Sequence, residues 1–146
     1  MKDVNEMRLE FDSRSCNEGF ARVAVAAFMS QMNPTLEEVD DVKTALSEAV
    51  TNSVVHGYEG QVKKITVECR IQGQELALMV ADEGCGIENI RQAMEPLFTT
   101  KPEAERSGMG FSFMEAFMDQ VRVESAPGQG TRVYMKKRVG RTACDQ

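Results

Sequence analysis

The order of periodicities along the chain is the feature that most limits its fold. Apolar residues recur at helical spacing over about Ser15–Met32 and again after Thr35, whereas most later segments alternate with the two-residue period of strands. Asn33 and Pro34 separate the two helical segments, because a residue before proline is pushed out of the helical region. This order predicts an α+β fold, a two-layer sandwich in which a mostly antiparallel sheet packs on helices. The apolar positions of the first helix are Phe20, Val23, Ala24, Ala27 and Phe28.

Local signals place the remaining elements. Thr35 and Glu38 form a predicted capping box, and the helix that they start continues to His56, with Gly57 as its stop. A short helix over about Ile87–Met94, a polar loop over Pro96–Ser107 and a helix from Gly108 to about Met118 are also expected. The expected strands are Met7–Asp12, Lys64–Ile71, Glu75–Ala81, Val121–Glu124 and Thr131–Lys136.

Composition excludes several classes of function. We expect residues 1–146 to form one domain, with a flexible tail over 137–146. A formal charge of −6 and a sequence pI of about 4.9 argue against nucleic acid as a direct ligand, which normally needs a basic face. The four cysteines form no C-x-x-C pair, and no apolar run approaches the roughly 18 residues of a membrane span. We therefore expect a cytoplasmic protein with reduced thiols, no structural zinc and no membrane segment.

Three polar residues on the second helix form the first candidate for a functional site. Glu48, Asn52 and His56 are spaced at i, i+4 and i+8, so they share one ridge that borders the apolar stripe of the helix. A carboxylate and an amide at the rim of a core suit the wall of a pocket. Taken alone, the same residues are better explained as a solvated helix face.

A second candidate follows a predicted strand. Asp82 stands at the end of that strand, and Gly84 and Gly86 let the backbone pass close to a ligand. An ionised carboxylate accepts a hydrogen bond from an exocyclic amine such as that of adenine. By itself, this D-x-G-x-G segment is also typical of an ordinary turn.

A third candidate opens the helix that follows the polar loop. Ser107, Gly108, Met109 and Gly110 stand where unpaired backbone N–H groups and the helix dipole favour phosphate. In isolation, this segment is also explained as a flexible start to a helix. Each residue of the loop before it is, by itself, better explained as part of a solvated charged loop. The residues of that loop that offer phosphate contacts are Thr99, Thr100, Lys101 and Arg106.

Together and in this order, the three candidates resemble the histidine-kinase-like ATPase superfamily, which shares the Bergerat nucleotide fold. The resemblance covers about Leu36–Met135 and implies that the chain binds ATP and Mg²⁺. It implies that Glu48 is the general base, that Asn52 helps hold Mg²⁺ against the phosphates, and that Asp82 contacts adenine. The other implied positions are the glycine turn at Gly84 and Gly86, the lid glycines Gly108 and Gly110, and Thr131 as support for the adenine pocket.

The segments 48–57, 96–101 and 105–111 are similar to those of the anti-sigma factor kinases of spore-forming bacteria, over nearly the full length. This resemblance implies a homodimer that inhibits a sporulation sigma factor of RNA polymerase and phosphorylates a serine of an anti-anti-sigma factor. Arg106 is then the candidate for stabilising the transferring phosphoryl group. Residues 1–34, with Arg14 and Arg22, are the expected partner or dimer face.

Two other functions fit parts of the pattern. One is the ATP-binding domain of a sensor histidine kinase, which is disfavoured because the chain offers no dimerisation helix with a phospho-accepting histidine. The other is a nucleotide-gated binding module without catalysis, which would need Asn52 and Asp82 but has no use for a base at Glu48.

Overall fold

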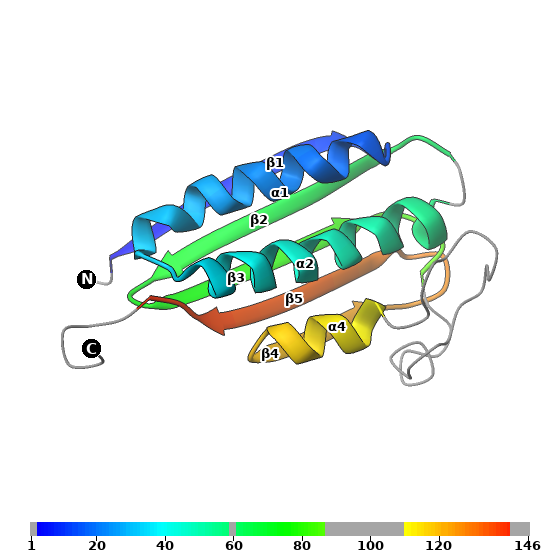
Figure 1. Ribbon diagram of the computed structural model, residues 1–146. Helices are drawn as coiled ribbons and strands as arrows, with labels where there is room; N and C mark the ends of the chain where they lie inside the picture. Colours follow the sequence, from blue (N-terminus) through cyan, green and yellow to red (C-terminus); the bar gives the residue numbers. More distant parts are fainter. Residues whose placement is uncertain (1–2, 59–60, 87–109, 141–146) are drawn as a thin grey trace.

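The computed structural model describes residues 3–58, 61–86 and 110–140, and these residues form two layers. The first layer is a sheet of strands in the order β1-β2-β3-β5-β4, and its neighbouring strands are antiparallel. The helices of the second layer all lie on one face of this sheet (Figure 1). The predicted α+β sandwich is therefore confirmed. The bounds are β1 Val4–Asp12, α1 Cys16–Met29, α2 Leu36–Asn52, β2 Lys64–Gln72, β3 Glu75–Asp82, α4 Gly110–Phe117, β4 Gln120–Ser125 and β5 Thr131–Arg138.

The junction between α1 and α2 follows from its turn residues. After a short 3₁₀ turn, Asn33 adopts a left-handed backbone with φ of 54°, which asparagine tolerates better than most residues. Thr35 then begins α2 through the predicted capping box. Its hydroxyl accepts from the Glu38 backbone N–H at 3.1 Å, and the Glu38 carboxylate accepts from the Thr35 N–H at 2.8 Å.

The core lies between the helices and one face of the sheet. On β3, Leu76, Leu78 and Val80 point into it, and the alternation of a strand gives Asp82 the same direction. The other face of the sheet carries mainly polar and charged side chains. Strand parity therefore directs the carboxylate at the end of β3 toward the helices.

The buried face of α1 differs from the apolar positions that the sequence emphasised. The helix buries Ala21, Val25 and Met29, whereas Phe20 is 54% exposed and Val23 is 67% exposed. The helix phase that turns Ala21, Val25 and Met29 toward α2 and the sheet leaves Phe20 and Val23 on the surface. Within the described part of the chain, no helix is long and apolar enough to cross a membrane.

The end of the chain is ordered further than expected. β5 continues to Arg138, Val139 is fully buried, and its N–H donates to the Gln74 carbonyl at 2.8 Å. The Gly140 N–H donates to the Glu38 carboxylate at 3.2 Å. Residues 137–140 are thus part of the fold and not of a flexible tail, and residues 141–146 lie outside the described residues.

The close approach at Gly140 gives a prediction about stability. Gly140 has a φ of +83°, and a Cβ there would lie 2.2 Å from the Met32 carbonyl oxygen. Gly73 has a φ of +61° and nothing within 4 Å of a Cβ, so it is a matched control for the backbone strain alone. We expect Gly73→Ala to lower the free energy of unfolding by about 1–2 kcal/mol, and Gly140→Ala to lower it by distinctly more. Urea unfolding measures both, and equal losses would contradict the collision.

Candidate functional site

The Asp82 carboxylate is the centre of the candidate site. Its residue is 6% exposed, and the carboxylate accepts from the Ser53 hydroxyl at 2.7 Å and from the Gly84 N–H at 2.9 Å. The backbone N–H of Thr131 is a third donor. These contacts join the C-terminal end of the α2 helix, the end of β3 and the start of β5 at one point.

Burial dominates the electrostatics of this carboxylate. Desolvation raises the pKa of Asp82, and the hydrogen bonds from Ser53, Gly84 and Thr131 oppose that rise. A carboxylate offers about four lone-pair positions, of which these three donors use three. Among the described residues these are the three donors to Asp82, and the fourth position suits a donor such as the exocyclic amine of an adenine ring.

The helix that carries Glu48 and Asn52 changes its winding next to Asp82. The α-helix ends at Asn52, and Ser53–Gly57 forms a π turn in which the Tyr58 N–H donates to the Ser53 carbonyl at 3.1 Å. The chain thus stays helical through His56, as predicted, although its last turn is a π turn that also includes Gly57. Glu48 and Asn52 are both half-buried on α2. Single π turns of this kind are frequent at functional sites.

The glycine turn after β3 is packed against the hairpin that joins β4 and β5. Gly86 has a φ of +77°, and a Cβ there would lie 1.9 Å from the Ala126 carbonyl oxygen. Gly130 has a φ of +78°, and its Cβ would lie 2.2 Å from the Asp82 carbonyl oxygen. The Gly128 N–H also donates to the Cys85 carbonyl at 2.6 Å. Any side chain at Gly86 or Gly130 would separate the two segments.

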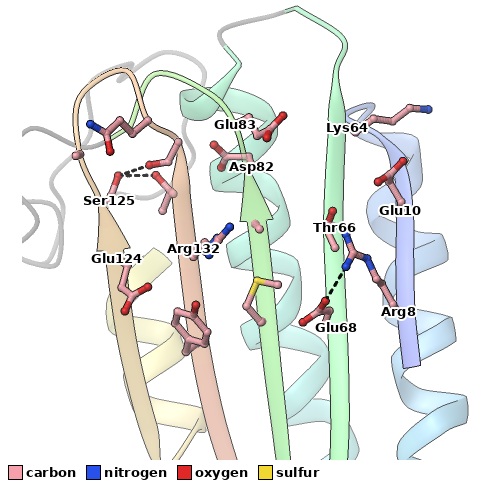
Figure 2. A pocket seen from close by; sticks show the side chains of 17 residues that line it. Arg8, Glu10, Lys64, Thr66, Glu68, Asp82, Glu83, Glu124, Ser125 and Arg132 are labelled. Carbon is pink, nitrogen blue, oxygen red and sulfur yellow. Dashed lines mark hydrogen bonds and ion pairs between the residues drawn. The ribbon is translucent and has the colours of Figure 1, made fainter. Parts of the chain in front are cut away.

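Thr131 lies beside this contact. It is half-buried, and its Oγ1 lies 2.8 Å from the Ser125 Oγ, which also donates to the Gly130 carbonyl at 2.8 Å (Figure 2). The Thr131 side chain therefore helps to fix the hairpin, while its backbone N–H reaches Asp82.

A separate depression lies on the helix-free face of the sheet. Charged side chains of the strands line it, among them Arg8 and Glu68, which form an ion pair at 3.2 Å (Figure 2). Asp82 and Thr131 belong to one end of this depression. Ser53, which donates to the Asp82 carboxylate, lies on the opposite, helix-covered side of the sheet. We therefore place the candidate site on the helix-covered side of Asp82 and not in the depression.

The structure brings together part of the predicted site. Asp82, Gly84, Gly86 and Thr131 form one connected cluster that adjoins the end of α2, and Gly110 is the first residue of α4. The contacts of Ser53 and Tyr58 with the Asp82 segment were not predicted from the sequence. For Ser53 a signal exists, because its hydroxyl falls on the apolar stripe of the helix and is therefore expected to be buried. The predicted residues outside the described ones are Thr99, Thr100, Lys101, Arg106, Ser107, Gly108 and Met109.

Comparison with known proteins identifies the family of the chain. Residues 13–137 match the family described as the histidine kinase-like ATPase domain. The chain is 61% identical over 133 residues to the anti-sigma F factor of Clostridium kluyveri, which covers 91% of this chain and 94% of that protein. It is 57% identical over 134 residues to the anti-sigma F factor of Clostridium acetobutylicum, with 92% and 94% covered. The chain belongs to the histidine kinase-like ATPase family and, within it, to the group of proteins named anti-sigma F factor.

Solved structures share the fold. The RsbU and RsbW domains of a Mycobacterium tuberculosis protein match with a TM-score of 0.68 and 19% identity, over 95% of this chain and 34% of that longer chain. Full-length ShkA in complex with AMPPNP matches with a TM-score of 0.54 and 20% identity, over 88% of this chain and 31% of that one. At these identities the likeness concerns the fold alone.

The raised pKa of Asp82 predicts an unusual pH dependence. The folded chain binds the Asp82 proton more tightly than the unfolded chain, so ionisation costs stability as pH rises from 3.8 through the folded pKa. Asp82→Asn should therefore gain stability relative to the wild type over this window. Urea unfolding between about pH 3 and pH 7 measures the difference.

Asp12→Asn is the matched control, with the opposite sign. The hydrogen bond and the charge of Lys64 lower the pKa of Asp12, so its ionised form favours the folded state, and this contribution is lost as pH falls through the folded pKa. Relative to the wild type, Asp12→Asn should lose stability as pH rises toward 3.8. If both variants shift in the same direction, the burial of Asp82 does not control its titration.

Proposed function

We propose that this protein is an ATP-dependent anti-sigma factor, which inhibits a sporulation sigma factor of RNA polymerase and phosphorylates a serine of an anti-anti-sigma factor. The observation that carries the proposal is the buried Asp82 carboxylate, which accepts from three donors among the described residues on three segments that meet at one point. The names of the Clostridium relatives support the partner class.

Adenine recognition and metal binding fit the residues present. Asp82 accepts a hydrogen bond from the exocyclic amine of adenine, and Gly84 and Gly86 allow the backbone to approach the base. Mg²⁺ usually takes one or two protein oxygens together with substrate phosphates and water, so the amide oxygen of Asn52 is sufficient as a protein ligand. When bound, the metal would supply charge neutralisation on the phosphates. The proposed phosphate contacts are Thr99, Thr100, Lys101, Ser107, Gly108, Met109 and Gly110.

Phosphoryl transfer needs a base and a positive charge. In our proposal Glu48 takes the proton from the serine hydroxyl of the partner while the serine oxygen forms a bond to the γ-phosphorus. The bond from that phosphorus to the β,γ-bridging oxygen breaks, and ADP leaves with the electron pair. Arg106 stabilises the charge on the transferring group.

The partner face follows from what α1 leaves on its surface. Phe20 and Val23 are exposed beside Arg22, whose guanidinium forms an ion pair with Glu18 at 3.3 Å. An apolar stripe with a flanking arginine is typical of a protein-binding surface. We propose that residues 1–34 supply the face used for the sigma factor, the anti-anti-sigma factor or the second copy of a homodimer.

One experiment tests the activity as a whole. Purified protein is incubated with γ-labelled ATP, Mg²⁺ and the candidate anti-anti-sigma factor, and the labelled product is digested and mapped. Label on a serine supports the proposal. Acid-labile label on a response regulator would favour a sensor histidine kinase instead, and nucleotide binding without any transfer would favour a non-catalytic module.

Glu48 and Asn52 allow binding and chemistry to be separated. Glu48→Gln keeps the shape of the side chain but removes the proton acceptor, so transfer should fall by about 10²- to 10⁴-fold while Mg-ATP affinity changes little. Asn52→Ala should weaken Mg-ATP binding itself. Single-turnover transfer and nucleotide titration on the same preparations read both effects. If Glu48→Gln transfers phosphate at the wild-type rate, Glu48 is not the general base.

Arg22 tests the partner face. Arg22→Glu should weaken sigma-factor binding by at least about tenfold, because a like charge at an interface costs several kcal/mol, and should leave ATP binding intact. The matched control is the exchange Glu18→Arg/Arg22→Glu, which restores the ion pair on α1 but not the charge pattern. Binding rescued by the exchange would mean that Arg22 only stabilises the helix, and unchanged binding by Arg22→Glu would place the partner face elsewhere.

A further inference from the structure

The Tyr58 hydroxyl joins three segments of the candidate site. Tyr58 is 4% exposed, and its hydroxyl donates to the Lys64 carbonyl at 2.6 Å and accepts from the Glu83 N–H at 2.7 Å. Lys64 begins β2, and Glu83 is the first residue of the glycine turn. The phenol therefore ties the turn that follows β3 to the end of the helix and to the neighbouring strand.

Two side chains at the two ends of the π turn hold adjacent residues of that segment. Ser53 binds the Asp82 carboxylate, while Tyr58 binds the backbone N–H of Glu83. The bond from the Tyr58 N–H to the Ser53 carbonyl fixes the two side chains relative to each other. The orientation of Asp82 thus depends on both contacts, one at its side chain and one at the following peptide.

We propose that Tyr58 is a positioning residue for base recognition, which orients Asp82 and the glycine turn so that the site selects a 6-aminopurine nucleotide over a 6-oxopurine nucleotide. This inference rests on the proposed function, in which Asp82 accepts the amine of adenine. Tyr58 acts through Glu83 and Asp82 and does not itself contact the base. Burial raises the pKa of the Tyr58 phenol, so the hydroxyl keeps the proton that it donates to Lys64.

The effect should be confined to the base. In the proposed site, the turn at 83–86 serves adenine, whereas the phosphates are held by Asn52 with the metal and by the start of α4. Without the hydroxyl, the turn loses the partly buried hydrogen bond that holds the Glu83 N–H to Tyr58, so the turn is free to shift. Such a shift misplaces the Asp82 carboxylate but leaves the phosphate contacts in place.

The test compares dissociation constants for ATP and ITP, which differ at position 6 of the purine, and adds tripolyphosphate as a probe without a base. The variants are Tyr58→Phe and Tyr134→Phe. Tyr134 is a suitable control because it is the only other tyrosine and lies half-buried on the sheet with the Arg122 guanidinium 4.3 Å from its ring centroid. If Tyr58→Phe is too unstable for titration, the shift of its unfolding midpoint with each ligand gives the same comparison.

We expect the wild type to bind ATP more tightly than ITP. In Tyr58→Phe the ratio of the ITP and ATP dissociation constants should fall about tenfold, while the affinity for tripolyphosphate stays unchanged. Tyr134→Phe should keep the wild-type ratio. An equal loss of ATP and ITP binding would show that Tyr58 only stabilises the fold, and an unchanged ratio would show that it does not position the turn; either result overturns the inference. A wild type that binds ATP and ITP equally would instead contradict the adenine role of Asp82 in the proposed function, and the inference with it.

Discussion

The Ser53–Asp82 hydrogen bond is the contact on which the arrangement of the site depends. An ionised carboxylate buried in a protein interior is costly unless hydrogen bonds compensate for the lost water. Here the compensation comes from donors on three different segments, so the helix, the β3 turn and the β5 hairpin must all reach the same place. Satisfying one carboxylate therefore fixes the relative position of elements that are far apart in the sequence.

Close backbone contacts make this arrangement possible. The turn at 83–86 and the hairpin at 126–130 meet through Gly86 and Gly130, where a Cβ would collide with a carbonyl oxygen. Both glycines also have positive φ, so each is required twice, for its backbone conformation and for its missing side chain. Tyr58 adds a side-chain link on the other side of the same turn. The turn is held from both sides before any ligand binds.

The sequence predicted those features that depend on local chemistry. The capping box at Thr35, the two strands over 64–71 and 75–81, and the place of Asp82 at a strand end follow from residues a few positions apart, and the structure contains all of them. The face of α1 could not be predicted because that helix is apolar over most of its circumference. Only its packing on α2 and the sheet sets the phase that buries Ala21 and Val25 and leaves Phe20 and Val23 exposed. The links Tyr58–Glu83 and Glu38–Gly140 join residues 25 and 102 positions apart, beyond the reach of any local pattern.

The position of α2 decides how a nucleotide site could influence a partner face. Among the described elements, α1 packs on α2 and on β1 and β2, whereas α2 packs on both α1 and α4. The C-terminal end of α2 carries Glu48, Asn52 and the link through Ser53 to Asp82, and its N-terminal cap binds Gly140 through Glu38. Any effect of the nucleotide on the exposed stripe of α1 must therefore pass through α2 or through the sheet beneath it. Hydrogen bonds to other segments hold α2 near both of its ends, through Ser53 to Asp82 and through Glu38 to Gly140. Of the described elements, α2 both packs on α1 and carries the proposed ATP-site residues Glu48 and Asn52, so it adjoins both proposed surfaces.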